Sequence, residues 1–288
     1  MTMRKKLWDR QSYLAVLAFI LAGMLGACSS DSGLGTGTQL NQPAIAEDQG
    51  HDHHSDGAKE ELLHTEWSFQ PYDRLAGETL QLELRIADAD GEPVQQFDVN
   101  HEKKLHLIVI SEDLSYFDHV HPEYTGNGLF RQSLTLPTGG KYKLFADFQP
   151  TGYAQTTAST IVHVEGEHTL EPVIEDQVRV KTTDKAAVEL KVSSLAVGGE
   201  SELTFTFRNP KSGADLSDLQ PYLGAIGHVV IISEDLDHYL HVHPVRELGS
   251  GPEARFATRF PAEGMYRIWG QFQRDGEVFT VPFTVKAQ

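Results

Sequence analysis

Apolar and polar residues alternate with a period of two along much of the chain after residue 66. Residues 78–86 read ETLQLELRI and residues 201–208 read SELTFTFR, so every second side chain is apolar. This alternation predicts β-strands with one buried face. Gly, Pro, Asn and Asp cluster between the runs, as in Asp90-Gly91-Glu92-Pro93, and no long helical period is present. The pattern therefore predicts an all-β protein built from antiparallel sandwiches.

One motif occurs twice. Residues 106–122 read HLIVISEDLSYFDHVHP and residues 228–244 read HVVIISEDLDHYLHVHP, with 10 of 17 positions identical at an offset of 122. The similarity extends to the flanking segments, where residues 140–149 match residues 264–273. A repeat of about 100 residues is typical of immunoglobulin-like domains. We therefore predict two tandem immunoglobulin-like β-sandwiches, over residues 64–166 and 175–288, joined by an acidic segment.

The N-terminus has the features of an export signal. Four basic residues precede an apolar run at positions 13–25, which leads into Leu25-Gly26-Ala27-Cys28. This resembles the lipobox of bacterial lipoproteins, which are cut before the cysteine and lipidated on it. We expect a signal peptide over residues 1–27, lipidation of Cys28, and a flexible tether over residues 28–63. The protein is then held at the cell membrane, facing outside the cytoplasm; an ordinary signal peptide with a chance cysteine is the alternative.

Charge and cysteine content restrict the partners. Without residues 1–27 the chain has 20 Lys and Arg against 40 Asp and Glu, which argues against nucleic acid or anionic lipid. Cys28 is the only cysteine, so no disulfide and no thiolate ligand is expected in the folded part. A metal site here must use imidazole, carboxylate or thioether groups, which favours copper(II), zinc(II) or nickel(II) over ions that prefer thiolate.

The residues shared by the two copies include three histidines each. They are His106, His119 and His121 in the first copy and His228, His241 and His243 in the second. In an extended His-x-His segment both imidazoles point to the same face, so each pair can bind one cation, and the histidine that begins the apolar strand can add a third ligand. The tether carries a second candidate, a short tract with His51, His53 and His54.

Structural roles explain the same residues. Histidines can close loops through hydrogen bonds, and Ser111 and Asp113, like Ser233 and Asp235, are typical of a capped turn. Asp113 is also a candidate acceptor for fixing an imidazole tautomer. The aromatic residues at alternate positions are expected in the sandwich cores: Phe117, Tyr142, Phe145, Phe148, Tyr239, Tyr266, Trp269 and Phe272.

The pattern H-x4-S-E-D-L-x4-H-V-H-P resembles secreted bacterial sandwich domains of the YtkA-like and FixH-like families, which occur among copper and heavy-metal handling proteins. The resemblance implies an immunoglobulin-like, cupredoxin-like or copper-carrier-like sandwich at the envelope. The leading hypothesis is a lipid-anchored protein that binds copper or zinc in metal trafficking or buffering, with an envelope protein as candidate partner. The alternative is a non-catalytic interaction module with structural histidines. No nucleophile elbow, triad order or phosphate loop is present, so an enzyme is not expected.

Overall fold

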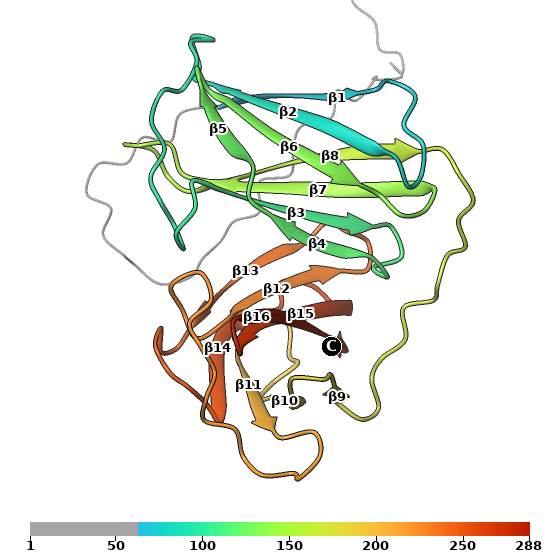
Figure 1. Ribbon diagram of the computed structural model, residues 1–288, viewed down its shortest axis with the longest axis vertical. Helices are drawn as coiled ribbons and strands as arrows, with labels where there is room; N and C mark the ends of the chain where they lie inside the picture. The colour runs from blue at the N-terminus through green and yellow to red at the C-terminus, as the bar shows by residue number, and fades with distance from the viewer. Residues whose placement is uncertain (1–62) are drawn as a thin grey trace, which may run out of the picture. The chain divides into compact units, whose positions relative to one another are not determined.

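The computed structural model describes residues 63–288, and for His241 and His243 it describes the backbone alone. These residues belong to a single compact unit, and every regular element among them is a β-strand (Figure 1). Within this part of the chain no helix has the length and apolarity to cross a membrane. The first copy contains β1 (His64–Gln70), β2 (Thr79–Ala87), β3 (Leu105–Ser111), β4 (Phe117–Val120), β5 (Glu123–Gly126), β6 (Leu129–Thr135), β7 (Gly140–Phe148) and β8 (Thr156–Val164). The second contains β9 (Val180–Thr182), β10 (Ala187–Val192), β11 (Glu200–Arg208), β12 (His228–Ser233), β13 (Tyr239–Pro244), β14 (Glu253–Arg259), β15 (Gly264–Arg274) and β16 (Glu277–Ala287).

The first copy is a sandwich of two antiparallel sheets (Figure 1). Their strand orders are β1-β2-β6-β5 and β4-β3-β7-β8. This arrangement corresponds to the two facing sheets of an immunoglobulin-like domain. Alternate side chains of both sheets fill the space between them, the largest being Phe130, Tyr142 and Phe148, and Phe97 from the connection between β2 and β3 packs with them. The predicted all-β tandem sandwich architecture is thus confirmed.

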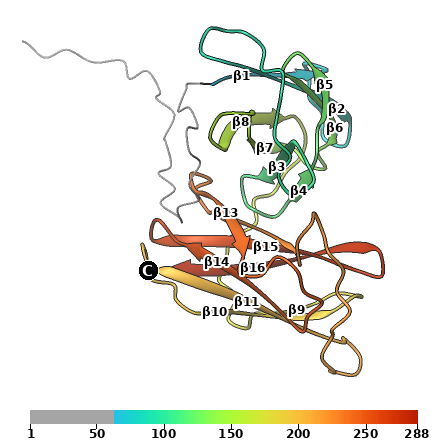
Figure 2. The ribbon, with the colours of Figure 1, turned by 90° about the vertical axis from the view of Figure 1, so that its left-hand side faces the viewer.

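The second copy repeats this arrangement with one change. One sheet contains β16, β15, β12 and β13, and the other contains β14, β11, β10 and β9 (Figure 2). Strand β13 pairs with β12 through residues 239–242 and then with β14 through its last two residues, so it connects the sheets at one edge. In the first copy the chain is interrupted at the same point and forms β4 and β5 as separate strands.

Each copy contains a tyrosine corner. The hydroxyl of Tyr142, near the start of β7, donates to the carbonyl oxygen of Thr138 at 2.9 Å. Tyr266, near the start of β15, donates to the carbonyl oxygen of Ala262 at 2.9 Å. A buried tyrosine that bonds the backbone just upstream of this strand is a hallmark of immunoglobulin-like sandwiches, where it fixes the connection between the two sheets.

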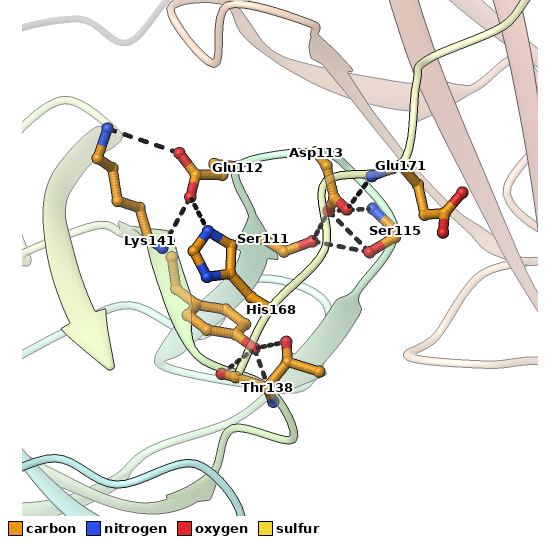
Figure 3. A network of polar contacts seen from close by, with 9 residues as sticks. Ser111, Glu112, Asp113, Ser115, Thr138, Lys141, His168 and Glu171 are labelled. Carbon is orange, nitrogen blue, oxygen red and sulfur yellow. Dashed lines mark hydrogen bonds and ion pairs between the residues drawn. The ribbon is translucent and has the colours of Figure 1, made fainter. Parts of the chain in front are cut away.

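The Ser-Glu-Asp-Leu segment closes the turn after β3 (Figure 3). The hydroxyl of Ser111 donates to Oδ1 of Asp113 at 2.6 Å, and the backbone N–H of Ser115 donates to the same oxygen at 3.0 Å. The other carboxylate oxygen accepts the backbone N–H of Glu171 at 3.0 Å, which ties the segment between the copies to the turn. Asp113 therefore holds the backbone of this turn in place. The expected role of Asp113 as an acceptor for an imidazole is not the one seen here, because its partners are Ser111, Ser115 and Glu171. Ser233 and Asp235 form the equivalent contact in the second copy.

Removing the Asp113 carboxylate should destabilise the fold at neutral pH. Burial by itself raises the pKa of Asp113, but hydrogen bonds from Glu171, Ser111 and Ser115 outweigh it and lower the pKa to about 2. The unfolded chain has a pKa of about 3.9 for this group, so its stabilising contribution is complete above that pH and is lost as the pH falls toward 2. We expect Asp113→Ala to lower the free energy of unfolding by about 1–2 kcal/mol at pH 7. Denaturant titrations should show the difference from the unmodified chain shrinking below pH 4; an equal difference at pH 7 and at pH 2.5 would contradict this assignment.

Strands β3 and β12 are buried on both faces. In β3, Leu107 and Val109 belong to the core of their own sandwich, whereas Ile108 and Ile110 belong to a separate apolar cluster. Strand β12 divides in the same way between its own core and that cluster. A strand covered on both faces has a continuous apolar run rather than an alternating one, which accounts for the sequences LIVI and VVII at these positions.

The separate cluster joins the two copies. Its buried members from the first copy are Ile108, Ile110, Leu114 and Phe145, and those from the second are Val230, Ile232 and Trp269. At its rim Phe117 stacks on Trp269 with ring centroids 4.8 Å apart, and Phe145 stacks on Tyr239 at 5.1 Å. These two pairs use equivalent positions of the repeat in exchanged roles, as in a two-fold symmetric interface. The expectation that these four aromatic residues lie inside the sandwiches is therefore wrong, because the second face of each central strand is covered by the other copy.

Candidate metal centre

Equivalent strands of the two copies position the central histidines. His106 is the second residue of β3, and His228 is the first residue of β12. His119 lies in β4, where its Cα partner in the adjacent strand is Ile108. His121 follows directly after the end of β4. The same ends of the two central strands thus supply imidazoles to one place.

Three of these imidazoles form one buried group. His106, His119 and His228 are only 3%, 8% and 6% exposed, and each offers a ring nitrogen within 4.8 Å of those of the other two. The ring centroids of His106 and His228 are 5.4 Å apart, and those of His119 and His228 are 5.1 Å apart. Two nitrogen ligands of a tetrahedral zinc ion lie about 3.3 Å apart. Small ring rotations would therefore bring all three nitrogens to one ion.

Neighbouring oxygens determine which nitrogens of two rings meet. Nε2 of His106 lies 3.0 Å from the carbonyl oxygen of Asn100, and Nδ1 of His119 lies 2.6 Å from Oε1 of Gln271. Both oxygens are acceptors, so both nitrogens carry the proton. The remaining nitrogens, Nδ1 of His106 and Nε2 of His119, then face each other at 3.0 Å. In two neutral rings this opposes two lone pairs, so a shared proton or a cation must lie between them.

His121 adds a fourth imidazole beside this pair. Its ring centroid is 4.8 Å from that of His119 and 5.1 Å from that of His106. Burial, followed by the charges of His106 and Lys103, lowers the pKa of His121 to about 4, so this ring is neutral at pH 7. Its Nε2 is buried, and no group in the described part of the chain hydrogen-bonds to it. His121 therefore has both the position and the neutral ring that an additional metal ligand requires.

The strand partners of the central histidines differ between the copies. Gln271 of β15 is the Cα partner of His228, and at the equivalent position of the first copy Asp147 of β7 is the partner of His106. Gln271 is 6% exposed, and its amide nitrogen faces Thr280 at 3.5 Å, which leaves Oε1 to accept from His119. The Asp147 carboxylate is 2% exposed and accepts from the amide of Gln155. A carbonyl-type acceptor behind a ligating imidazole is the usual support of a metal site.

Two contributors escaped the sequence analysis. His101 places its ring 5.0 Å from that of His228, and Gln271 orients His119. Selecting residues that both copies share passes over them, because Leu223 takes the place of His101 and Asp147 that of Gln271. His101 could have been noticed in the sequence as a histidine of the first copy that stands close to the three repeated ones.

The remaining candidate residues lie outside the described side chains. His51, His53, His54 and Cys28 fall within residues 1–62. The side chains of His241 and His243 are likewise outside the description, although their backbone belongs to β13. In that strand His241 has Val230 as its partner, which is the register position of His119 beside Ile108. The described imidazoles therefore combine both copies in one group, a point on which the sequence left separate and joint binding by the copies equally open.

The donor set fits a borderline divalent ion. Among the described residues the buried group offers imidazole nitrogens, and the only cysteine of the chain is Cys28. Imidazole ligands suit zinc(II) and copper(II), whereas copper(I) prefers sulfur ligands. The facing lone pairs of His106 and His119 and the buried Nε2 of His121 are each explained by a cation between the rings.

Comparison with known proteins gives a family without a described activity. A family model described as a domain of unknown function, DUF8832, matches residues 61–166 and 181–288. No curated protein sequence matches the chain.

Several solved structures of bacterial surface proteins show distant likeness. The Escherichia coli adhesin FdeC is 16% identical with a TM-score of 0.27, and 78% of this chain aligns with 65% of that one. The Yersinia pseudotuberculosis adhesin InvE is 10% identical with a TM-score of 0.24, covering 76% and 58% of the two chains. The D00-D0 domain of intimin is 11% identical with a TM-score of 0.22, covering 77% and 98%. Scores at this level carry no inference about function.

The repeated motif, the two sandwiches and the family match agree on the same division of the chain. The matched segments together cover well over half of the sequence, and each contains one copy of the histidine motif. This protein therefore belongs to the DUF8832 family and carries its domain twice.

Proposed function

We propose that this protein binds one divalent transition-metal ion, copper(II) or zinc(II), between its two sandwiches, and that it serves metal buffering or trafficking outside the cytoplasm. His106, His119 and His228 are the proposed core ligands, with His121 beside them. One observation carries the proposal: the nitrogens of His106 and His119 that point at each other are those left unprotonated by the carbonyl of Asn100 and the amide oxygen of Gln271.

Membrane attachment completes the proposal. Leu25-Gly26-Ala27-Cys28 supports lipidation of Cys28, and residues 28–63 would tether the sandwiches to the lipid. The tether histidines His51, His53 and His54 would then form a weaker site without fixed geometry. The resemblance to YtkA-like and FixH-like domains supports a role beside copper or heavy-metal handling proteins, with one of them as a partner.

A purely structural role for the histidines is the alternative. A single proton shared between His106 and His119 would also relieve the opposed lone pairs, and the protein would then act as an interaction module with two immunoglobulin-like domains. This alternative leaves the buried Nε2 of His121 unexplained. It predicts no affinity for metal in the folded part.

Calorimetric titration separates the two functions. The full-length, tag-free lipoprotein in detergent, with His51, His53 and His54 replaced by alanine, is titrated with copper(II) and with zinc(II). The metal hypothesis predicts one ion bound per chain with micromolar or stronger affinity. Absence of binding to both ions at micromolar concentration supports the structural alternative and ends the proposal.

The acceptor behind His119 should tune the affinity. Gln271→Leu removes the oxygen that holds the Nδ1 proton of His119, and loss of such an acceptor typically weakens metal binding about 10- to 100-fold. Gln271→Glu retains an acceptor and should bind metal at least as well as the unmodified chain. Dissociation constants for zinc(II) check both variants. Equal loss of affinity in the two variants would show that packing, rather than the hydrogen bond, matters at this position.

A further inference from the structure

Two tight turns meet beside the imidazole group. In the first copy the backbone N–H of Lys103 donates to the carbonyl oxygen of Asn100 at 3.0 Å, and the two central residues have positive φ. In the second copy residues 222–225 form the equivalent turn. A side-chain carbon added at Gly224 would lie 3.7 Å from Cγ of Glu102, so the two turns are in contact range. One turn comes from each copy, and both lie next to the proposed metal centre.

The first turn uses unfavourable residues. Both central positions of a type I′ turn require φ above zero, which favours Asn and Gly. The second copy has Leu223 at φ +52° followed by Gly224, whereas the first has side chains at both positions, His101 at φ +47° and Glu102 at φ +65°. A residue with a side chain in this region costs about 1–2 kcal/mol. Sparsely populated backbone conformations of this kind concentrate at functional sites, so the turn that carries two such residues is a candidate functional segment.

His101 lies between a cleft and the buried imidazoles. The two turns, together with Gln155 and Glu247, line a cavity of about 430 Å³. His101 is part of that lining, and its ring centroid is 5.0 Å from that of His228 and 6.2 Å from that of His106. No other described residue of the cavity lining has a ring contact with the buried group. A cation in the cleft and a cation in the centre would therefore both be near this imidazole.

The charges of the cleft lining favour the approach of a cation through the cleft. The carboxylates of Glu102 and Glu247 belong to the cleft lining, and the region from Cys28 onward carries a net charge of −20. Lys103, the last residue of the first turn, acts electrostatically on His121, so the carboxylates of Glu102 and Glu247 supply the attraction for a cation in the cleft. Since the central histidines are less than a tenth exposed, an ion needs a defined route to them.

From this arrangement we infer that the cleft between the two turns is the access site for the metal, and that His101 transfers the ion between the cleft carboxylates and the buried imidazoles. The inference rests on the proposed function. The transfer is a ligand exchange without change of oxidation state: the ion leaves water and carboxylate oxygens, binds an imidazole nitrogen of His101, and passes to nitrogens of the buried group. The proton held between His106 and His119 in the metal-free protein is released to water. His101 is thus a carrier and no permanent ligand of the centre.

Replacing His101 with asparagine tests this role. Asparagine accepts the left-handed conformation of the turn, so the metal-free His101→Asn variant should melt at or above the temperature of the unmodified chain. Stopped-flow mixing with zinc(II) should show association slowed at least tenfold. Release of zinc(II) to a chromogenic chelator should be slowed by a similar factor. The equilibrium stoichiometry and dissociation constant should stay within threefold of the original.

The outcomes separate this inference from the function on which it rests. Unchanged rates would exclude transfer through His101, and faster release with a tenfold weaker dissociation constant would make it a permanent ligand; both results overturn the inference while leaving metal binding in place. Failure of the unmodified chain to bind zinc(II) or copper(II) overturns the proposed function itself. His163→Asn, an exposed substitution in β8, is the matched control and should alter neither rate.

Discussion

Replacement of His228 with alanine is expected to abolish tight metal binding, although the His119-x-His121 pair of the first copy stays intact. The described imidazole group draws His228 from the second copy and His106 and His119 from the first. Removing one of three core ligands should weaken the site by at least about 100-fold, which corresponds to about 2.8 kcal/mol of binding free energy at about 1.4 kcal/mol per tenfold change.

The measurement is the dissociation constant for zinc(II) of the full chain without the tether histidines. His163→Ala provides the control, because this histidine is exposed on β8 at the far edge of its sheet. It should leave the affinity unchanged. If His228→Ala bound zinc(II) as tightly as the control, each copy would hold its own ion through its His-x-His segment, and a shared centre would be excluded.

Truncation of Trp269 should lower both stability and metal affinity. Its side chain is 3% exposed, stacks on Phe117 with planes inclined by 15°, and belongs to the apolar cluster between the copies. Trp269→Ala should cost about 3–5 kcal/mol of unfolding free energy. Because the proposed ligands come from both sides of this cluster, loosening it should weaken zinc(II) binding more than tenfold.

Leu134→Ala is the matched comparison for this effect. Leu134 is also nearly buried, at 4% exposed, but it lies in the core of the first sandwich. Its truncation should cost about 2–5 kcal/mol and leave the zinc(II) affinity of the folded protein unchanged. Denaturant titrations give the stability of each variant, and calorimetry below the unfolding transition gives the affinity. Equal affinity in the two variants would show that the docking of the copies does not support the metal centre.

The sequence was sufficient for the architecture because each copy obeys local rules. Alternation at Leu80, Leu82 and Leu84 marks a strand with one face in the core, and these side chains are indeed buried together. Repetition of the motif at a fixed offset predicts two copies of one fold. The hydrogen bonds of Ser111 with Asp113, and of Ser233 with its partner, follow from residue types that cap turns.

Docking of the copies could not be derived in the same way. Periodicity shows that a face is buried without showing what covers it, so Phe145 and Trp269 were assigned to the sandwich cores. The continuous apolar runs of β3 and β12 carried the missing information, since a strand with Ile108 and Val109 both buried must be covered on two faces. The shared imidazole group follows from that docking, and so do the roles of His101 and Gln271.

Native mass spectrometry of the full chain, with His51, His53 and His54 replaced by alanine, tests the shared centre most directly. After exposure to excess zinc(II) and removal of loosely bound ions, the account predicts one ion per chain, and no retained ion in either His119→Ala or His228→Ala. Two ions on the parent chain, with one retained in each variant, would show that the copies bind metal independently and would contradict the account.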